Sequence, residues 1–96
     1  MARRRMISSS IYEDDWYGPL SFFEKELWVG LFVRGADDQG RLQDNPILIR
    51  SQIFMYNDVQ IQEIEDALTK FSEDGKIIRY DVEGKKLTHL DRDWET

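Results

Sequence analysis

The fold of this chain is decided by the stretch Asp37-Asp38-Gln39-Gly40-Arg41-Leu42-Gln43-Asp44-Asn45-Pro46. A polar turn ends at Gly40, and the pair Arg41-Leu42 that follows suits a very short strand. Asn45 is a typical N-cap, and Pro46 suits the first position of a helix. Because an apolar segment precedes the stretch, the order helix, very short strand, helix is predicted across it.

The apolar segment upstream carries its own start signal. Ser21 is a plausible N-cap, and Glu24 three residues later completes a capping box. The predicted helix runs from there to about Gly35. Its apolar side chains cover most of the circumference, which is typical of a helix at the centre of a domain or partly covered by another chain.

Two further helices are predicted downstream. The second runs from Pro46 to about Phe54, and the third follows a cap at Asp58 and ends near Asp74-Gly75, where Gly75 provides the C-terminal stop. The third helix carries a clean core stripe at spacings of three and four. That stripe consists of Ile61, Ile64, Leu68 and Phe71.

A β-hairpin is predicted to close the fold. Lys76 to Val82 is rich in β-forming residues, Glu83-Gly84 is a tight-turn signal, and Lys85 to Leu90 is the returning strand. The sequence therefore predicts the α+β class and a winged helix-turn-helix. Three helices form its core, the hairpin is the wing, and Arg41-Leu42 adds a minimal third strand at the hairpin's edge.

The domain organisation follows from length and local composition. With 96 residues the chain is expected to hold one domain over residues 11–94, preceded by a flexible basic arm at 1–10 and followed by a tail at 95–96. The absence of cysteine excludes disulfides and thiolate metal sites. Neither a signal-peptide pattern nor an apolar run of membrane-spanning length is visible, so we expect a cytoplasmic protein without a membrane partner.

The chain shows no convergent catalytic set. His89 is the single histidine, and the acidic pairs Asp14-Asp15 and Asp37-Asp38 are typical of turns and caps. The sequence contains no glycine-rich phosphate loop and no nucleophile elbow. We therefore expect no enzyme activity, no catalytic residue, no metal, no cofactor and no small-molecule substrate.

Some features of the charge pattern favour DNA binding and others oppose it. The formal net charge is −6, which opposes phosphate binding unless basic residues cluster. On the third helix Gln62 and Thr69 are suited to reading base edges, whereas its acidic residues would repel phosphates. On the wing, Lys85 and Lys86 are suited to backbone contacts. The candidate DNA-binding residues are Arg3, Arg4, Arg5, Arg50, Gln62, Thr69, Lys70, Lys85 and Lys86.

The apolar content points to a second kind of partner. The second helix carries more apolar side chains than one core can take up, and the tryptophans near both ends add to this surplus. Surplus apolar surface is typical of protein–protein contacts. The candidate partner-binding residues are Ile47, Leu48, Trp16 and Trp94.

Three stretches resemble a known family. They are Phe32 to Pro46 with its Ala-Asp-Asp-Gln-Gly-Arg-Leu turn, Ile53 to Val59 with its Phe-Met-Tyr turn, and Ile77 to Lys86 with its Ile-Ile-Arg-Tyr strand before a Gly-Lys wing. In spacing they resemble the N-terminal winged-helix domain of phage replication-initiation proteins of the replisome-organiser and primosome type. The resemblance covers about Ile7 to Trp94. It departs at Ile47 and Leu48, where the family often carries basic residues.

The resemblance implies a role in initiating phage or prophage replication, often beside a helicase-loading partner. In that family the domain is usually followed by a linker and a second domain, so this chain is expected to be an excised domain or a short stand-alone relative. Two hypotheses follow. The first is a DNA-binding winged helix. The second is an assembly module that self-associates or docks a replication partner without direct DNA contact.

Overall fold

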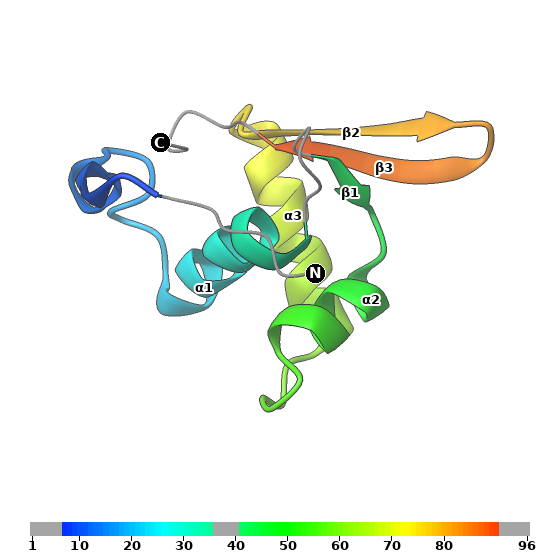
Figure 1. Ribbon diagram of the computed structural model, residues 1–96, viewed down its shortest axis with the longest axis horizontal. Helices are drawn as coiled ribbons and strands as arrows, with labels where there is room; N and C mark the ends of the chain where they lie inside the picture. The colour runs from blue at the N-terminus through cyan, green and yellow to red at the C-terminus, as the bar shows by residue number, and fades with distance from the viewer. Residues whose placement is uncertain (1–6, 36–40, 91–96) are drawn as a thin grey trace.

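The computed structural model describes residues 7–35 and 41–90. Within these ranges the chain forms three α-helices and a three-stranded antiparallel sheet, which confirms the expected α+β class (Figure 1). The elements in chain order are the 3-10 helix η1 (Ser9–Glu13), α1 (Phe22–Gly30), the π-helix η2 (Leu31–Gly35), β1 (Arg41–Gln43), α2 (Pro46–Ile53), α3 (Ile61–Glu73), β2 (Ile77–Val82) and β3 (Lys85–Leu90).

The start of α1 is the predicted capping box. The Ser21 hydroxyl accepts a hydrogen bond from the Glu24 N–H at 3.2 Å, and the Glu24 carboxylate accepts one from the Ser21 N–H at 3.0 Å. The helical run reaches the predicted end at Gly35, although its last part is the wider π-helical turn of η2. Reciprocal capping satisfies N–H groups that a helix start would otherwise leave without a partner.

The starts of α2 and α3 differ in how well the sequence predicted them. As expected, Asn45 caps α2, because its side-chain oxygen accepts from the N–H groups of Ile47 at 3.0 Å and Leu48 at 3.3 Å. The predicted cap of the third helix at Asp58 is wrong, since α3 begins at Ile61. Val59 packs against the core, which keeps the chain extended past Asp58.

The end of α3 is a Schellman motif. Gly75 adopts a positive φ of 76° and donates its N–H to the Ser72 carbonyl at 3.0 Å, while the Lys76 N–H reaches the Phe71 carbonyl at 2.9 Å. Glycine adopts this left-handed conformation without the steric cost that a Cβ brings. The turn directs the chain from α3 into β2.

The sheet has the expected hairpin and the expected third strand. Glu83 and Gly84 both have positive φ, 51° and 81°, which is the pattern of a type I′ turn. The strand order is β1-β3-β2, so β1 pairs with β3 and extends the hairpin on that side. In Figure 1 the sheet lies across one end of α3, and the hairpin extends beyond the helices.

Two buried aromatic rings, Trp28 and Phe71, lie in the core, and the half-buried Trp16 packs against them. Trp16, Trp28 and Phe71 make mutual edge-to-face contacts with ring centroids 5.0 to 5.5 Å apart. The Trp16 indole N–H donates to the Asp74 carboxylate at 2.8 Å, which satisfies its polar edge. Around the rings, the fully buried aliphatic side chains are Leu27, Leu31, Ile49, Ile64 and Leu68. These contacts join the segment before α1 to both α1 and α3.

The folded part begins earlier than residue 11. Ile7 packs against the core, and η1 already begins at Ser9, whose neighbour Ser8 accepts a hydrogen bond from the Ser10 N–H at 3.3 Å. Residues 7–10 therefore contribute to the domain, although the sequence placed them in the arm. Residues 1–6 lie outside the described ranges.

We expect Gly30→Ala to destabilise the domain by about 1 kcal/mol. A Cβ at this position would lie 2.6 Å from the Ile53 side chain, and overpacking typically costs about 1–3 kcal/mol, which exceeds the gain in helix propensity of about 1 kcal/mol. Urea denaturation measures the change. In an Ile53→Ala background the same substitution should no longer destabilise, and equal costs in both backgrounds would contradict the contact.

Candidate nucleic-acid and protein interfaces

The outward face of α3 holds the two residues expected to read bases. Gln62 donates from its side-chain amide to the Asp66 carboxylate at 2.8 Å, and the Thr69 hydroxyl donates to the Glu65 carboxylate at 3.2 Å. Both donors are thus used within α3 itself. A contact with a base edge would have to replace these bonds, and it would leave a carboxylate beside the nucleic acid.

The electrostatics of α3 are unfavourable for phosphates. The helix carries four acidic residues and one lysine, and that lysine, Lys70, pairs with Glu24 of α1 at 3.2 Å. Three of the four acidic residues are exposed, and they are Glu63, Asp66 and Glu73. Lys70, a predicted DNA-binding residue, therefore forms an ion pair that joins α3 to α1. Its charge does not neutralise the acidic face of α3.

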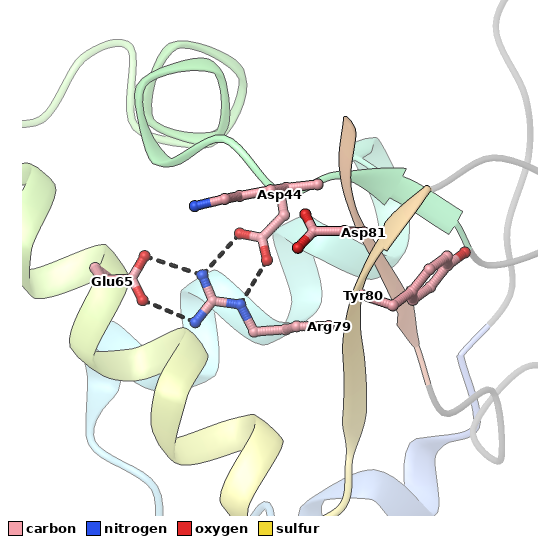
Figure 2. A pocket seen from close by; sticks show the side chains of 6 residues that line it. Asp44, Glu65, Arg79, Tyr80 and Asp81 are labelled. Atoms are coloured by element: carbon pink, nitrogen blue, oxygen red, sulfur yellow. Dashed lines mark hydrogen bonds and ion pairs between the residues drawn. The ribbon is translucent and has the colours of Figure 1, made fainter. Parts of the chain in front are cut away.

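An arginine missed by the sequence analysis links three elements beside this face. Arg79 of β2 lies between two carboxylates, one from Asp44 at the β1–α2 junction and one from Glu65 on α3 (Figure 2). Each carboxylate accepts two hydrogen bonds from the guanidinium. One Arg79 Nη atom lies 2.8 Å from Asp44 Oδ1 and 2.9 Å from Glu65 Oε1, and the other lies 2.7 Å from Glu65 Oε2. We call this arrangement the Arg79 clasp.

The clasp changes the protonation equilibria of its members. Hydrogen bonds to Asp44 and then to Glu65 raise the pKa of Arg79 above its ordinary value. The hydrogen bonds from Arg79 in turn lower the pKa of the Glu65 carboxyl. Because the Asp44 side chain is only 4% exposed, the guanidinium is the counter-charge that keeps this buried carboxylate satisfied.

A hollow of about 460 Å³ opens beside the clasp. It is lined by Asp44, Glu65, Arg79, Tyr80, Asp81 and Lys86. Its three carboxylates outnumber its two cations, and Arg79 already binds two of the carboxylates. The hollow therefore does not have the positive charge that a phosphate site requires.

The two hairpin lysines point to different surroundings. Lys86 lies opposite Asp81 in the strand register, and it is close enough to Glu65 to contribute to the lowered pKa of that carboxyl. Lys85 lies opposite Val82 and is exposed. Both lysines also line a hollow that includes Asp44.

The remaining basic candidates are not gathered with the hairpin. Arg50 is exposed on α2, and its guanidinium donates to the Val59 carbonyl at 3.4 Å. It lines a separate hollow of about 380 Å³ at the α2–α3 turn, whose lining includes neither hairpin lysine. Arg3, Arg4 and Arg5 lie outside the described residues. Lys85 and Lys86 line a common hollow of about 340 Å³, and Arg50 lies apart from it.

The partner-binding candidates have different environments. Ile47 is 62% exposed on α2, whereas Leu48 beside it is half-buried. Trp16 is also half-buried, because it is a member of the aromatic core described above. Its ring is thus used for internal packing. Trp94 lies outside the described residues.

Several exposed apolar residues were not among the sequence candidates. On β2, Ile78 is 63% exposed and Val82 is 46% exposed, with the half-buried Tyr80 between them. Tyr56 in the α2–α3 turn and Phe22 at the start of α1 are about nine-tenths exposed. The period-two spacing of the β2 residues was visible in the sequence, but which face meets water depends on the packing of α3.

Enzymatic features gain no support from the described part of the chain. Within it no group of three or more His, Asp or Glu side chains is arranged to hold a metal ion. His89 lies on β3, where its backbone pairs with Ile78 and Arg41. None of the helices described is both long and apolar enough to cross a membrane.

A comparison of the chain with protein-family models, with characterised proteins and with solved structures finds no match.

We expect Arg79→Ala to lower the free energy of unfolding by about 3 kcal/mol, because it leaves the buried Asp44 carboxylate without its counter-charge. Arg79→Lys should recover only part of this loss, since an ammonium group cannot form two bidentate pairs. Urea denaturation of both variants gives the values. A double-mutant cycle with Asp44→Ala should show a coupling energy above about 1 kcal/mol, and additive effects would contradict the clasp.

The clasp should also make stability depend on acid pH. The pKa of Glu65 lies below its ordinary value of 4.5 in the folded chain, so the ionised form stabilises the fold above that pH. This contribution is lost as the pH falls through the lowered pKa. Melting temperatures measured from pH 7 to pH 3 at constant ionic strength should fall less steeply below pH 4.5 in Glu65→Gln than in the wild type. Parallel curves would show that Glu65 makes no such contribution.

Proposed function

We propose that this chain is a winged-helix assembly module of a replication-initiation protein, and that it binds a protein partner and does not read DNA with α3. Support for the winged helix comes from the element order and from β1, which pairs at the edge of the hairpin as that fold requires. The replication context comes from the family resemblance of the turn before α2, the turn before α3 and the hairpin.

The observation that carries the proposal is the charge around α3. In a winged helix, α3 is the element that enters the major groove. Here its outward face is acidic, its one lysine pairs with Glu24, and the nearest guanidinium is held by Asp44 and Glu65. Bringing this face to phosphates would add repulsion without releasing counterions, which is the main source of affinity for DNA.

The apolar side chains support the protein partner. Ile47, Ile78 and Val82 are each roughly half exposed or more, although they lie on regular secondary structure. Exposed apolar side chains grouped along one strand are typical of surfaces that another protein covers. The half-buried Tyr80 joins Ile78 and Val82 into one continuous stripe on β2.

Contact with the phosphate backbone of DNA is the second candidate function. Lys85 and Lys86 are exposed on β3, and Arg50 is exposed on α2. Such side chains can contact phosphates without reading sequence. With so few cations, binding of this kind would be weak and strongly reduced by salt.

Fluorescence anisotropy with labelled single-stranded and double-stranded DNA across a salt series separates the two candidates. We expect the double variant Gln62→Ala/Thr69→Ala to bind DNA no differently from the wild type, because α3 does not meet bases. A loss of DNA affinity of tenfold or more in that variant is what the removal of one or two base contacts would cause. That result would overturn the assembly proposal. Lys85→Ala/Lys86→Ala is the matched test of the second candidate. It should flatten the salt slope by about 2 if both lysines contact phosphates.

A further inference from the structure

The sheet has one face that none of the three α-helices covers. In Figure 1 all three lie on the same side of the sheet. On that inner side Leu42, Ile77 and Thr88 are buried, and Arg79 reaches Glu65 of α3. The side chains that alternate with these along the strands point the other way. We call the opposite side of the sheet the outer face.

The strand register shows which described side chains lie on the outer face. Figure 2 shows Tyr80 on the side of β2 opposite Arg79, and strand alternation places Ile78 and Val82 beside Tyr80. Residues that pair across an antiparallel sheet share a face, so the register adds one described residue of β3 and two of β1. The described side chains of the outer face are therefore Arg41, Gln43, Ile78, Tyr80, Val82 and Lys85.

The alternation along β2 is the reverse of what a solvated sheet face carries. Antiparallel sheets that meet water on one side commonly place apolar side chains inward and polar ones outward. On β2 the charged Arg79 and Asp81 lie inward, whereas Ile78 and Val82 lie outward and are 63% and 46% exposed. The half-buried Tyr80 lies between them. Such an apolar stripe is typical of a surface that another protein covers.

The outer face also differs in charge from the rest of the chain. The chain contains 19 Asp and Glu residues, yet no described side chain of the outer face is acidic. On the hairpin, Asp81 lies on the inner side and Glu83 lies in the turn. Arg41 and Lys85 are exposed at opposite corners of the face, about 13 Å apart along the strands. The apolar stripe is therefore flanked by positive charge.

We propose that the outer face binds an amphipathic helix of the protein partner, and that this helix carries Asp or Glu side chains beside its apolar positions. The inference rests on the proposed function and names the chemistry of the partner. Apolar side chains spaced i, i+3, i+4 and i+7 place one side of such a helix on Ile78, Tyr80 and Val82. The carboxylates on its flanks then meet Lys85 and Arg41. Packing of a helix on a sheet face is the ordinary way in which that face is buried.

The side chains of the outer face favour an acidic helix over nucleic acid. Single strands bind to sheets by stacking their bases on several aromatic side chains, and Tyr80 is the one aromatic side chain described on this face. Ile78 and Val82 offer aliphatic surface, which packs against apolar side chains. A partner with carboxylates beside its apolar positions complements Lys85 as well, and charge complementarity of this kind selects among partners.

A synthetic peptide tests the face. The probe is a labelled peptide of about 15 residues, long enough to be partly helical in water, with leucine at i, i+3, i+4 and i+7 and glutamate on the flanks. Methyl NMR of the full chain locates its binding. We expect the signals of Ile78 and Val82 to shift, while Val33, which is 50% exposed on η2, keeps its signal. Unshifted signals of Ile78 and Val82 at about 1 mM peptide would overturn the proposal.

A matched pair of variants tests the apolar contact. Ile78→Ser and Ile47→Ser each remove an isoleucine, and the two side chains are 63% and 62% exposed. The first lies on the outer face and the second on α2. In fluorescence anisotropy we expect Ile78→Ser to bind the peptide about tenfold more weakly than the wild type, and Ile47→Ser to bind it equally well. An unchanged affinity in Ile78→Ser, or an equal loss in both variants, would contradict the proposed contact.

Charge reversal tests the acidic flanks. Lys85→Glu should weaken peptide binding by about threefold or more, because it replaces an attraction with a repulsion. Arg34→Glu makes the same change of charge on η2, which packs against α1 and α2, and should leave the affinity unchanged at about 0.15 M ionic strength. Circular dichroism checks that both variants fold. Equal effects would show a response to net charge alone and would count against the proposal.

Single-stranded DNA is the competing occupant. An oligonucleotide that shifts the signals of Ile78 and Val82 when the peptide does not would assign the outer face to nucleic acid and overturn the proposal. None of these results bears on the reading of bases by α3. The proposed function fails instead on the anisotropy of Gln62→Ala/Thr69→Ala, so the two failures are distinguishable.

Discussion

The position of the hairpin depends on the Arg79 clasp. Arg79 lies on β2, Asp44 joins β1 to α2, and Glu65 lies at the middle of α3, so one guanidinium ties the sheet to two helices. A buried carboxylate such as Asp44 is costly without a paired charge, which makes the arrangement cooperative. Together with Ile77, which is buried in the core, the clasp holds the hairpin against α3.

The same interaction limits what the surface can recognise. An arginine beside α3 would ordinarily supply positive charge to a DNA-binding face, but two carboxylates neutralise this one. Lys70 is likewise taken up by Glu24. In this domain two of the cations around α3 join elements to one another, and exposed apolar side chains lie on β2 and α2.

Much of the fold could be predicted because its signals are local. Ser21 with Glu24, Asn45 with Pro46, and Glu83 with Gly84 each fix a helix start or a turn within four residues, and all three are confirmed. The start of α3 was missed because Asp58 has the chemistry of a cap, whereas Gln60 is the N-cap and its N–H donates to the Glu63 carboxylate at 3.4 Å.

The candidate site was harder to predict because its contacts join distant residues. Asp44 and Arg79 are separated by 35 positions, and no spacing rule links them. From sequence alone Arg79 could not be told from an unpaired cation, and Trp16 was interpreted as surplus apolar surface although its ring packs against Phe71 of the core. The outer face of the sheet was equally hidden, since it follows from the strand register and not from the composition of the strands.

The pairing of β1 with β3 has a consequence for the order of folding. It joins Arg41 to His89 across α2, α3 and β2, whereas the β2–β3 hairpin closes through a two-residue turn. Loop closure over such a distance costs more chain entropy, so the hairpin should form early and β1 should dock late. Until β1 arrives, the nascent sheet has two uncovered edges. We expect this interval to be the one in which the domain is most prone to aggregate.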